Sequence, residues 1–303
     1  MKILVVGAGA VGSYYGGRLA LGGHDVTFIG RARHVQAIQA NGLTIDSKVT
    51  GKHNARVHAA EAVFASTPPD LVLLCVKSFD TEEAARSLRD LVAPYTVILC
   101  LQNGIDNHNI AGRILGPNRV HPTVIYVGVR ISEPGVVEHV GRGEIILPEK
   151  LSALCSTFAE AGIPARTTDN ILGMVWSKFL LNASCNALGM ISGISFGELA
   201  QSPEARQVIC GAVDEVVRIA EAKGVRIPGE DYPSQVLKTC ESLGVGLSSM
   251  LQDHRARKRI EIDALNGEVV RLGIELGIPT PYNATLYATG KLLPLQSVKR
   301  ESA

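Results

Sequence analysis

The sequence predicts an α/β protein in which a mainly parallel sheet is followed by an all-α region. Up to about residue 169, short apolar β-branched runs alternate with helical segments, which is the pattern of parallel βαβ units. From about residue 170, helical periodicity continues and strand-like runs almost vanish. A chain of 303 residues is long enough for about two domains. We therefore expect one domain at 1–169 and a second at 170–303.

The first βαβ unit lies at the N-terminus, where an apolar run ends abruptly in glycine and a helical pattern follows. The elements expected in the α/β part are strands at 2–6, 25–29, 71–76 and 96–101, with helices at 11–20 and 81–91. The segment 120–147 alternates apolar and polar residues around Pro134-Gly135. This alternation predicts antiparallel strands that complete the same sheet.

The all-α part is predicted from 3.6-residue periodicity. Its expected helices are 171–188, 203–223, 232–243, 252–276 and 283–293. The run Arg255, Arg257, Lys258 and Arg259 suggests a nucleic-acid surface. Asp253, Glu261 and Asp263 offset that charge, so we interpret the run as a solvated helix face.

Composition excludes several classes of function. The chain has 30 basic and 29 acidic residues, and aromatic residues make up 5%. It therefore offers neither the clustered basic surface nor the stacking platforms that nucleic acids require. No apolar run is long enough to span a membrane. The six cysteines are widely spaced and the eight histidines scattered, so we expect a cytoplasmic protein without disulfides or a metal site.

The strongest motif is a G-x-G-x-x-G sequence between the first strand and the first helix. It consists of Gly7, Ala8, Gly9, Ala10, Val11 and Gly12. In such a loop the first glycine forms the turn, the second admits a diphosphate, and the third lets helix and strand pack closely. A glycine-rich turn without a ligand is the alternative. The motif in this context favours a dinucleotide cofactor.

The end of the second strand indicates which dinucleotide. An NAD site usually has an acidic residue there, whereas this chain has Arg31 and Arg33 and no acid. Arginine suits a 2′-phosphate. We therefore predict NADP(H), with Arg31 as the first candidate, the alternative being a solvated surface arginine.

Two other groups of polar residues stand in apolar surroundings. Lys77 and Asn103 follow the strands at 71–76 and 96–101, and ligands of open α/β sheets bind at such strand ends. Lys178, Asn182 and Asn186 are four residues apart, which places them on one stripe of a helix. The stripe predicts a polar cleft wall. Ordinary loop residues and a solvated helix face are the respective alternatives.

Together these residues resemble the ketopantoate reductase family. The shared pieces are GAGAVG, Arg31, VKSF at 76–79, LQNG at 101–104, PGVVEHVGRG at 134–143, WSKFLLNASCN at 176–186, SSMLQD at 248–253, EID at 261–263 and IPTPYN at 278–283. The resemblance implies a Rossmann-type doubly wound sheet. It also implies a helical domain like the C-terminal domain of 6-phosphogluconate dehydrogenase, with the active site between the two.

The resemblance also implies roles for residues. The general acid is Lys178, Lys77 lines the cleft, and Asn103 binds cofactor and substrate. Asn182, Asn186, Ser249 and Glu261 bind substrate, with Ser248 an alternative to Ser249. The implied reaction is NADPH-dependent reduction of 2-dehydropantoate to pantoate, in the pathway to pantothenate and coenzyme A. The oligomeric state stays open, a homodimer included.

Chemistry agrees with these roles, because hydride addition to a ketone builds negative charge on oxygen, which an ammonium group stabilises and protonates. The chain departs from the family pattern at Ala187, where proline commonly follows the second asparagine. This departure leaves open a reductase of another 2-oxo acid. A non-catalytic NADPH-binding regulator is a further alternative, although such a protein needs no proton donor.

Overall fold

The computed structural model describes residues 1–63 and 67–301, and it divides the chain into two compact units. The first contains residues 1–102 and 106–171, and the second contains residues 103–105 and the chain from Leu172 onward. Of the helices in the described part of the chain, none combines the length and apolarity that a membrane crossing requires.

The first unit is built on a six-stranded sheet in which every neighbouring pair is parallel. Its strands are β1 (Lys2–Val6), β2 (Asp25–Ile29), β5 (His58–Ala60), β6 (Leu71–Leu74), β7 (Val97–Cys100) and β8 (Val120–Pro122). Their order in the sheet is β5-β2-β1-β6-β7-β8. This is the 3-2-1-4-5-6 order of a doubly wound sheet, with its switch point between β1 and β6. The predicted fold class is confirmed.

Both faces of this sheet are covered, because successive side chains of each strand point to opposite sides. Ile3 and Val5 of β1 belong to one apolar cluster, and Leu4 and Val6 belong to the other. The helices around the sheet are α1 (Ala10–Leu21), α2 (Ala32–Asn41), α3 (Thr81–Leu88) and α4 (Asn107–Leu115), with a short 3-10 turn η1 (Ser78–Asp80). Helices α3 and α4 cover the face that carries Leu4 and Val6.

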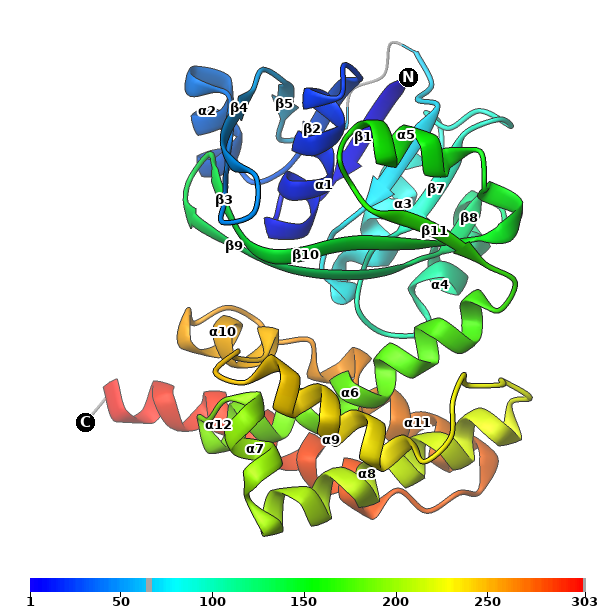
Figure 1. Ribbon diagram of the computed structural model, residues 1–303, viewed down its shortest axis with the longest axis vertical. Helices are drawn as coiled ribbons and strands as arrows, with labels where there is room; N and C mark the ends of the chain where they lie inside the picture. Colours follow the sequence, from blue (N-terminus) through cyan, green and yellow to red (C-terminus); the bar gives the residue numbers. More distant parts are fainter. Residues whose placement is uncertain (64–66, 302–303) are drawn as a thin grey trace. The chain divides into compact units, whose positions relative to one another are not determined.

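Helix α1 lies between the first sheet and a second sheet (Figure 1). Its strands are β3 (Leu43–Ser47), β4 (Gly51–Ala55), β9 (Val124–Glu133), β10 (Val136–Pro148) and β11 (Ala165–Thr168). The chain between β10 and β11 forms the turn η2 (Glu149–Leu151) and the helix α5 (Leu154–Glu160). Tyr14, Tyr15 and Leu19 of α1 are buried in the same cluster as Val137, Ile145 and Leu147 of β10.

The antiparallel pair predicted at 120–147 is present as β9 and β10, but the prediction that it completes the first sheet is wrong. The strand that extends the first sheet is β8, which runs parallel to β7. The long strand β10 instead pairs with β3 and with β11. Those partners are far away in sequence, and the alternation within 120–147 does not identify them.

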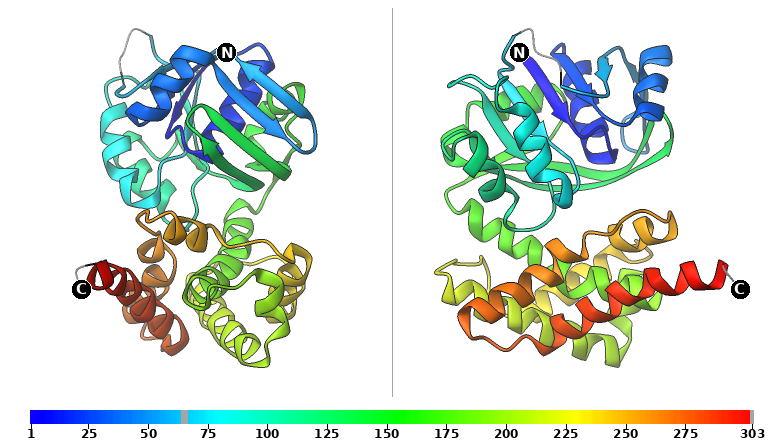
Figure 2. Two further views of the ribbon diagram at one scale, coloured as in Figure 1. Left: turned by 90° about the vertical axis from the view of Figure 1, so that its left-hand side faces the viewer. Right: turned by 180° about the vertical axis from the view of Figure 1, so that it is seen from behind.

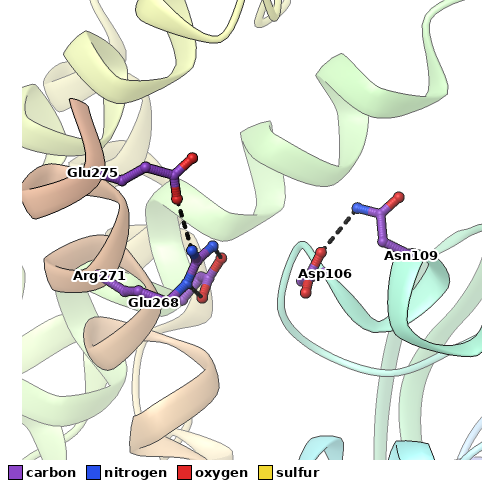
Figure 3. A network of polar contacts seen from close by, with 5 residues as sticks. All are labelled: Asp106, Asn109, Glu268, Arg271 and Glu275. Atoms are coloured by element: carbon purple, nitrogen blue, oxygen red, sulfur yellow. Dashed lines mark hydrogen bonds and ion pairs between the residues drawn. The ribbon is translucent and has the colours of Figure 1, made fainter. Parts of the chain in front are cut away.

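The second unit is entirely helical in its described part. Its elements are α6 (Ile171–Ser192), α7 (Phe196–Gln201), α8 (Pro203–Ala222), α9 (Tyr232–Leu243), α10 (Ser249–Arg255), η3 (Ile262–Ala264), α11 (Asn266–Leu276) and α12 (Pro281–Glu301). Helix α12 (red) packs along α11 (orange) in Figure 2. Arg271 on the exposed side of α11 joins Glu268 and Glu275, as Figure 3 shows together with the Asp106–Asn109 contact at the start of α4.

One predicted helix is wrong. The segment 252–276 does not form a single helix, because α10 ends at Arg255 and Arg257 has a positive φ of 53°. Glu261 lies in the irregular stretch before η3. The charged run Arg255–Arg259 therefore marks the end of one helix and the start of a loop.

A buried polar network joins four helices of the second unit. The Glu215 carboxylate on α8 accepts hydrogen bonds from the backbone N–H groups of Tyr282 (2.7 Å) and Asn283 (2.9 Å), in the first turn of α12. Asn283 Nδ2 donates to Glu215 (2.7 Å), and Asn283 Oδ1 accepts from Asn266 Nδ2 (3.0 Å) on α11. Asn266 Nδ2 also donates to the Ala183 carbonyl of α6 (2.8 Å). Glu215 therefore caps α12 from a neighbouring helix.

We expect Glu215→Ala to lower the free energy of unfolding by about 3 kcal/mol, because it leaves buried N–H donors without an acceptor. Urea unfolding followed by circular dichroism measures the change. The matched control is Asp214→Ala, which removes a carboxylate from the adjacent, exposed position of α8. Equal small losses in both variants would contradict a capping role for Glu215.

Candidate active site

The glycine loop between β1 and α1 has no room for side chains at two of its glycines. Gly7 has a positive φ of 105°, and a Cβ built there would lie 2.5 Å from the Val76 nitrogen. A Cβ on Gly12 would lie 2.2 Å from the Gly7 carbonyl oxygen and 2.9 Å from Val5. These contacts explain why the turn and the helix–strand packing both require glycine.

The loop is open at its middle glycine. Gly9 is exposed, and a Cβ built on it would meet nothing within 4 Å. It is the N-cap residue of α1, so the first N–H groups of the helix, including those of Ala10 and Val11, face the end of the helix without intrahelical acceptors. The first turn contains no acidic residue. An open backbone at a helix N-terminus fits the diphosphate of a dinucleotide.

The end of β2 passes directly beside this loop. The Ile29 carbonyl accepts hydrogen bonds from the N–H groups of Gly7 (2.9 Å) and Ala8 (3.0 Å). A Cβ on Gly30 would lie 2.6 Å from the Cβ of Ala8. Arg31, the next residue, is exposed and is the N-cap of α2. Arg31 thus follows directly on the segment that contacts the glycine loop, where an adenosine ribose would lie.

The ends of β6 and β7 bring Lys77 and Asn103 to the carboxyl edge of the sheet. Lys77 is half-buried and is the N-cap residue of η1. It follows Val76, whose nitrogen lies against Gly7 at the switch point. Asn103 comes three residues after the end of β7 and groups with the second unit.

Within the second unit, the polar stripe of α6 is turned inward. Asn182 and Asn186 are 9% and 2% exposed, which excludes a solvated outer face for them. The Asn182 Nδ2 atom lies 3.4 Å from the Asn103 Oδ1 atom. The structure therefore brings these two predicted residues together. Lys178, on the same stripe, is half-buried.

The serine pair at the start of α10 is distinguished by hydrogen bonding. Ser248 is buried; its hydroxyl donates to the Asn186 carbonyl (3.2 Å) and accepts from the Leu251 N–H (3.1 Å). Both roles of that hydroxyl are structural. Ser249 is exposed, which favours Ser249 over Ser248 as a substrate ligand. Glu261 is 7% exposed and stands just before η3.

Ala187 lies inside α6, which continues to Ser192. Its N–H is positioned to bond the Ala183 carbonyl, as in any helix interior. That carbonyl also accepts from Asn266 Nδ2 at 2.8 Å. A proline at this position would therefore leave the carbonyl with Asn266 as its partner.

Three groups of contacts around the predicted residues are not indicated by the sequence. His34 and Ser13 contact each other beside the glycine loop. Gln102 donates to Thr81 (2.6 Å), and Thr81 donates to Asn107 (2.8 Å), which ties the end of β7 to the first turns of α3 and α4. Asn266 supports α6. Each joins residues distant in sequence, so no short motif identifies these contacts.

Comparison with known proteins places the whole chain in one family. "Ketopantoate reductase PanE/ApbA" matches residues 3–151, and "Ketopantoate reductase PanE/ApbA C terminal" matches residues 170–293. The chain is 34% identical to the 2-dehydropantoate 2-reductase of Pyrococcus horikoshii, over 96% of this chain and 97% of the relative.

Solved structures agree with this placement. A PanE/ApbA family ketopantoate reductase from Ralstonia eutropha JMP134 is 39% identical, with a TM-score of 0.92 over 98% of this chain and 99% of that chain. A D-mandelate dehydrogenase with NADH and anilino(oxo)acetate is 27% identical, with a TM-score of 0.89 over 98% and 99% of the two chains. The chain belongs to the ketopantoate reductase family, a family of oxidoreductases.

Proposed function

We propose that this protein reduces 2-dehydropantoate (ketopantoate) to pantoate with NADPH. The observation that carries the proposal is the match over almost the full chain to proteins named 2-dehydropantoate 2-reductase, 34% and 30% identical in the first two relatives. A glycine loop shaped for a diphosphate and a buried pair of asparagines support it. A nicotinamide dinucleotide is the cofactor, and NADPH in particular follows from the exposed Arg31 at the end of β2.

A bound dihydronicotinamide would supply the hydride for the ketone carbon. Negative charge then develops on the carbonyl oxygen, and the Lys178 ammonium group stabilises it and donates the proton that completes the alcohol. Asn103, Asn182, Asn186 and Ser249 offer amide and hydroxyl groups for the substrate's carboxylate and hydroxyl. Glu261, almost fully buried, accepts a hydrogen bond from the substrate. Lys77, half-buried at the β6 end, lines the cofactor side.

A reductase of another 2-oxo acid is the second candidate. The D-mandelate dehydrogenase structures favour it, because that protein shares the fold at TM-scores of 0.89 and 0.88 and holds a different oxo acid in one complex. Ala187, fully buried in α6, is the position at which this helix departs from the family pattern.

An NADPH-oxidation assay distinguishes the two candidates. Ketopantoate is compared with a panel of 2-oxo acids of increasing size, including benzoylformate, at matched enzyme and cofactor concentrations. The proposal expects the highest kcat/KM for ketopantoate. Turnover of another acid with no activity on ketopantoate would contradict ketopantoate as the substrate, while the protein would remain an oxidoreductase.

We expect Arg31→Asp to invert the cofactor preference, because it replaces a 2′-phosphate ligand by a group that binds the 2′-hydroxyl. The ratio of kcat/KM for NADPH and NADH measures the effect. Arg33→Asp, which makes the same charge change two residues later, should alter the ratio less. An Arg31→Asp variant that still favours NADPH by about tenfold or more would rule out this contact.

We expect Lys178→Ala to lower kcat by about 10²–10⁴-fold, the usual effect of losing a general acid. NADPH affinity, measured by fluorescence titration, should stay near that of the wild type. Lys223→Ala, which removes an exposed lysine from the end of α8, is the control. Near-normal turnover of Lys178→Ala would refute the assigned role.

Glu261→Ala should raise KM for the oxo acid with little effect on the dissociation constant of NADPH, because the carboxylate is assigned to substrate and not to cofactor. Glu221→Ala, at an exposed position of α8, controls for loss of negative charge. An unchanged KM for the oxo acid together with weaker NADPH binding would contradict the substrate role of Glu261 and indicate a contact with the cofactor.

A further inference from the structure

His34 lies beside the glycine loop and takes part in a chain of hydrogen bonds that ends on that loop. The Gly135 N–H, in the turn between β9 and β10, donates to His34 Nδ1 at 3.0 Å. His34 Nε2 lies 3.1 Å from Ser13 Oγ. Ser13 Oγ in turn donates to the Ala8 carbonyl at 3.4 Å. Ser13 is fully buried in α1.

The direction of each bond in this chain is fixed by chemistry. An N–H group donates to Nδ1, so Nδ1 carries no proton and the neutral imidazole carries its proton on Nε2. The Nε2–H therefore donates to Ser13 Oγ, and the hydroxyl proton of Ser13 goes to the Ala8 carbonyl. Burial lowers the pKa of His34, which favours this neutral form.

The bond to the Ala8 carbonyl orients the next N–H group of the loop. The Ala8 carbonyl and the Gly9 N–H belong to one peptide, and in a trans peptide they point in opposite directions. Holding the carbonyl towards Ser13 turns the Gly9 N–H the other way. Gly9 is the exposed residue of the loop, with open space around the position of a Cβ.

His34 is also tied to the start of α2. Its backbone N–H donates to the Arg31 carbonyl at 3.0 Å, in the first turn of the helix that Arg31 caps. Residue 34 thus contacts the residue assigned to the 2′-phosphate through its backbone, and it reaches the peptide assigned to the diphosphate through its side chain and Ser13.

We propose that His34 is a positioning residue for the dinucleotide: through Ser13 it orients the Ala8–Gly9 peptide so that the Gly9 N–H faces the cofactor diphosphate. This inference rests on the proposed cofactor site and goes beyond it. His34 itself touches no reacting atom. Its effect should therefore appear in cofactor binding and in KM for NADPH, with kcat preserved.

Two substitutions separate the two bonds of the imidazole. His34→Asn keeps a group that accepts at the place of Nδ1, so the Gly135 contact remains and the Ser13 contact is lost. His34→Gln keeps a donor at the place of Nε2, so the Ser13 contact remains. Ser13→Ala removes the central hydroxyl. His58→Asn, at an exposed position of β5, is the matched control for loss of a histidine.

Binding is measured by titration of NADPH and of 2′-phospho-ADP-ribose, which has the diphosphate but no nicotinamide. His34→Asn and Ser13→Ala should each weaken both ligands about tenfold, the value of one lost hydrogen bond. The double variant should bind no more weakly than the weaker single one. His34→Gln and His58→Asn should bind within about twofold of the wild type. Melting temperatures without ligand check that each variant is folded.

Wild-type affinity in a folded His34→Asn variant, or additive losses in the double variant, would overturn the proposal. Because binding is measured without an oxo acid, the result is independent of the proposed reaction. If the variants weaken NADPH binding as expected but the wild type reduces no 2-oxo acid, the proposed reaction is wrong and the role of His34 stands. If the wild type is an active reductase and His34→Asn binds NADPH normally, the role of His34 is wrong and the proposed reaction stands.

Discussion

The close approach of β1, α1 and β6 at the glycine loop is the constraint on which the rest of the first unit depends. Gly7 presses against the Cys75–Val76 backbone, and Gly12 presses against Gly7 and Val5. Because nothing larger than hydrogen fits, the helix starts right at the carboxyl edge of the sheet. The strand ends that carry Arg31 and Lys77 reach that edge as well. The same contact that closes the core therefore gathers the polar groups around one open backbone.

Much of this architecture can be predicted from local sequence. The strands β1, β6 and β7 are buried on both faces, so each is a continuous apolar run that sequence reveals directly. The strands β3, β4 and β11 contain polar residues and have one exposed side. Their stability comes from β10 and from each other, and partners so distant in the chain leave no local signal. The alternation within 120–147 therefore predicts the wrong sheet for β10.

In the candidate site, too, some features can be predicted from local sequence and others depend on tertiary packing. The glycine loop, Arg31 and the stripe of α6 follow fixed spacings, and those are visible in sequence. Spacing alone left open whether Asn182 and Asn186 face solvent, which depends on tertiary packing, and both are buried. Ser248 and Ser249 are adjacent and identical in sequence, and they differ in the structure because Ser248 is buried and caps α10 whereas Ser249 is exposed. His34 lies 101 residues from its partner Gly135, so no short motif could have identified it.

The Ala183 carbonyl, in the middle of α6, accepts a hydrogen bond from the Asn266 side chain as well as lying in position for the bond within the helix. This second donor bears on which residues position 187 can hold. Proline inside a helix is normally destabilising, in part because the carbonyl one turn earlier loses its N–H donor. Here the Asn266 amide also donates to that oxygen, so proline at position 187 would not leave the Ala183 carbonyl without a donor. A change of residue at this one position can therefore be made while the hydrogen bond from Asn266 continues to join α11 to α6.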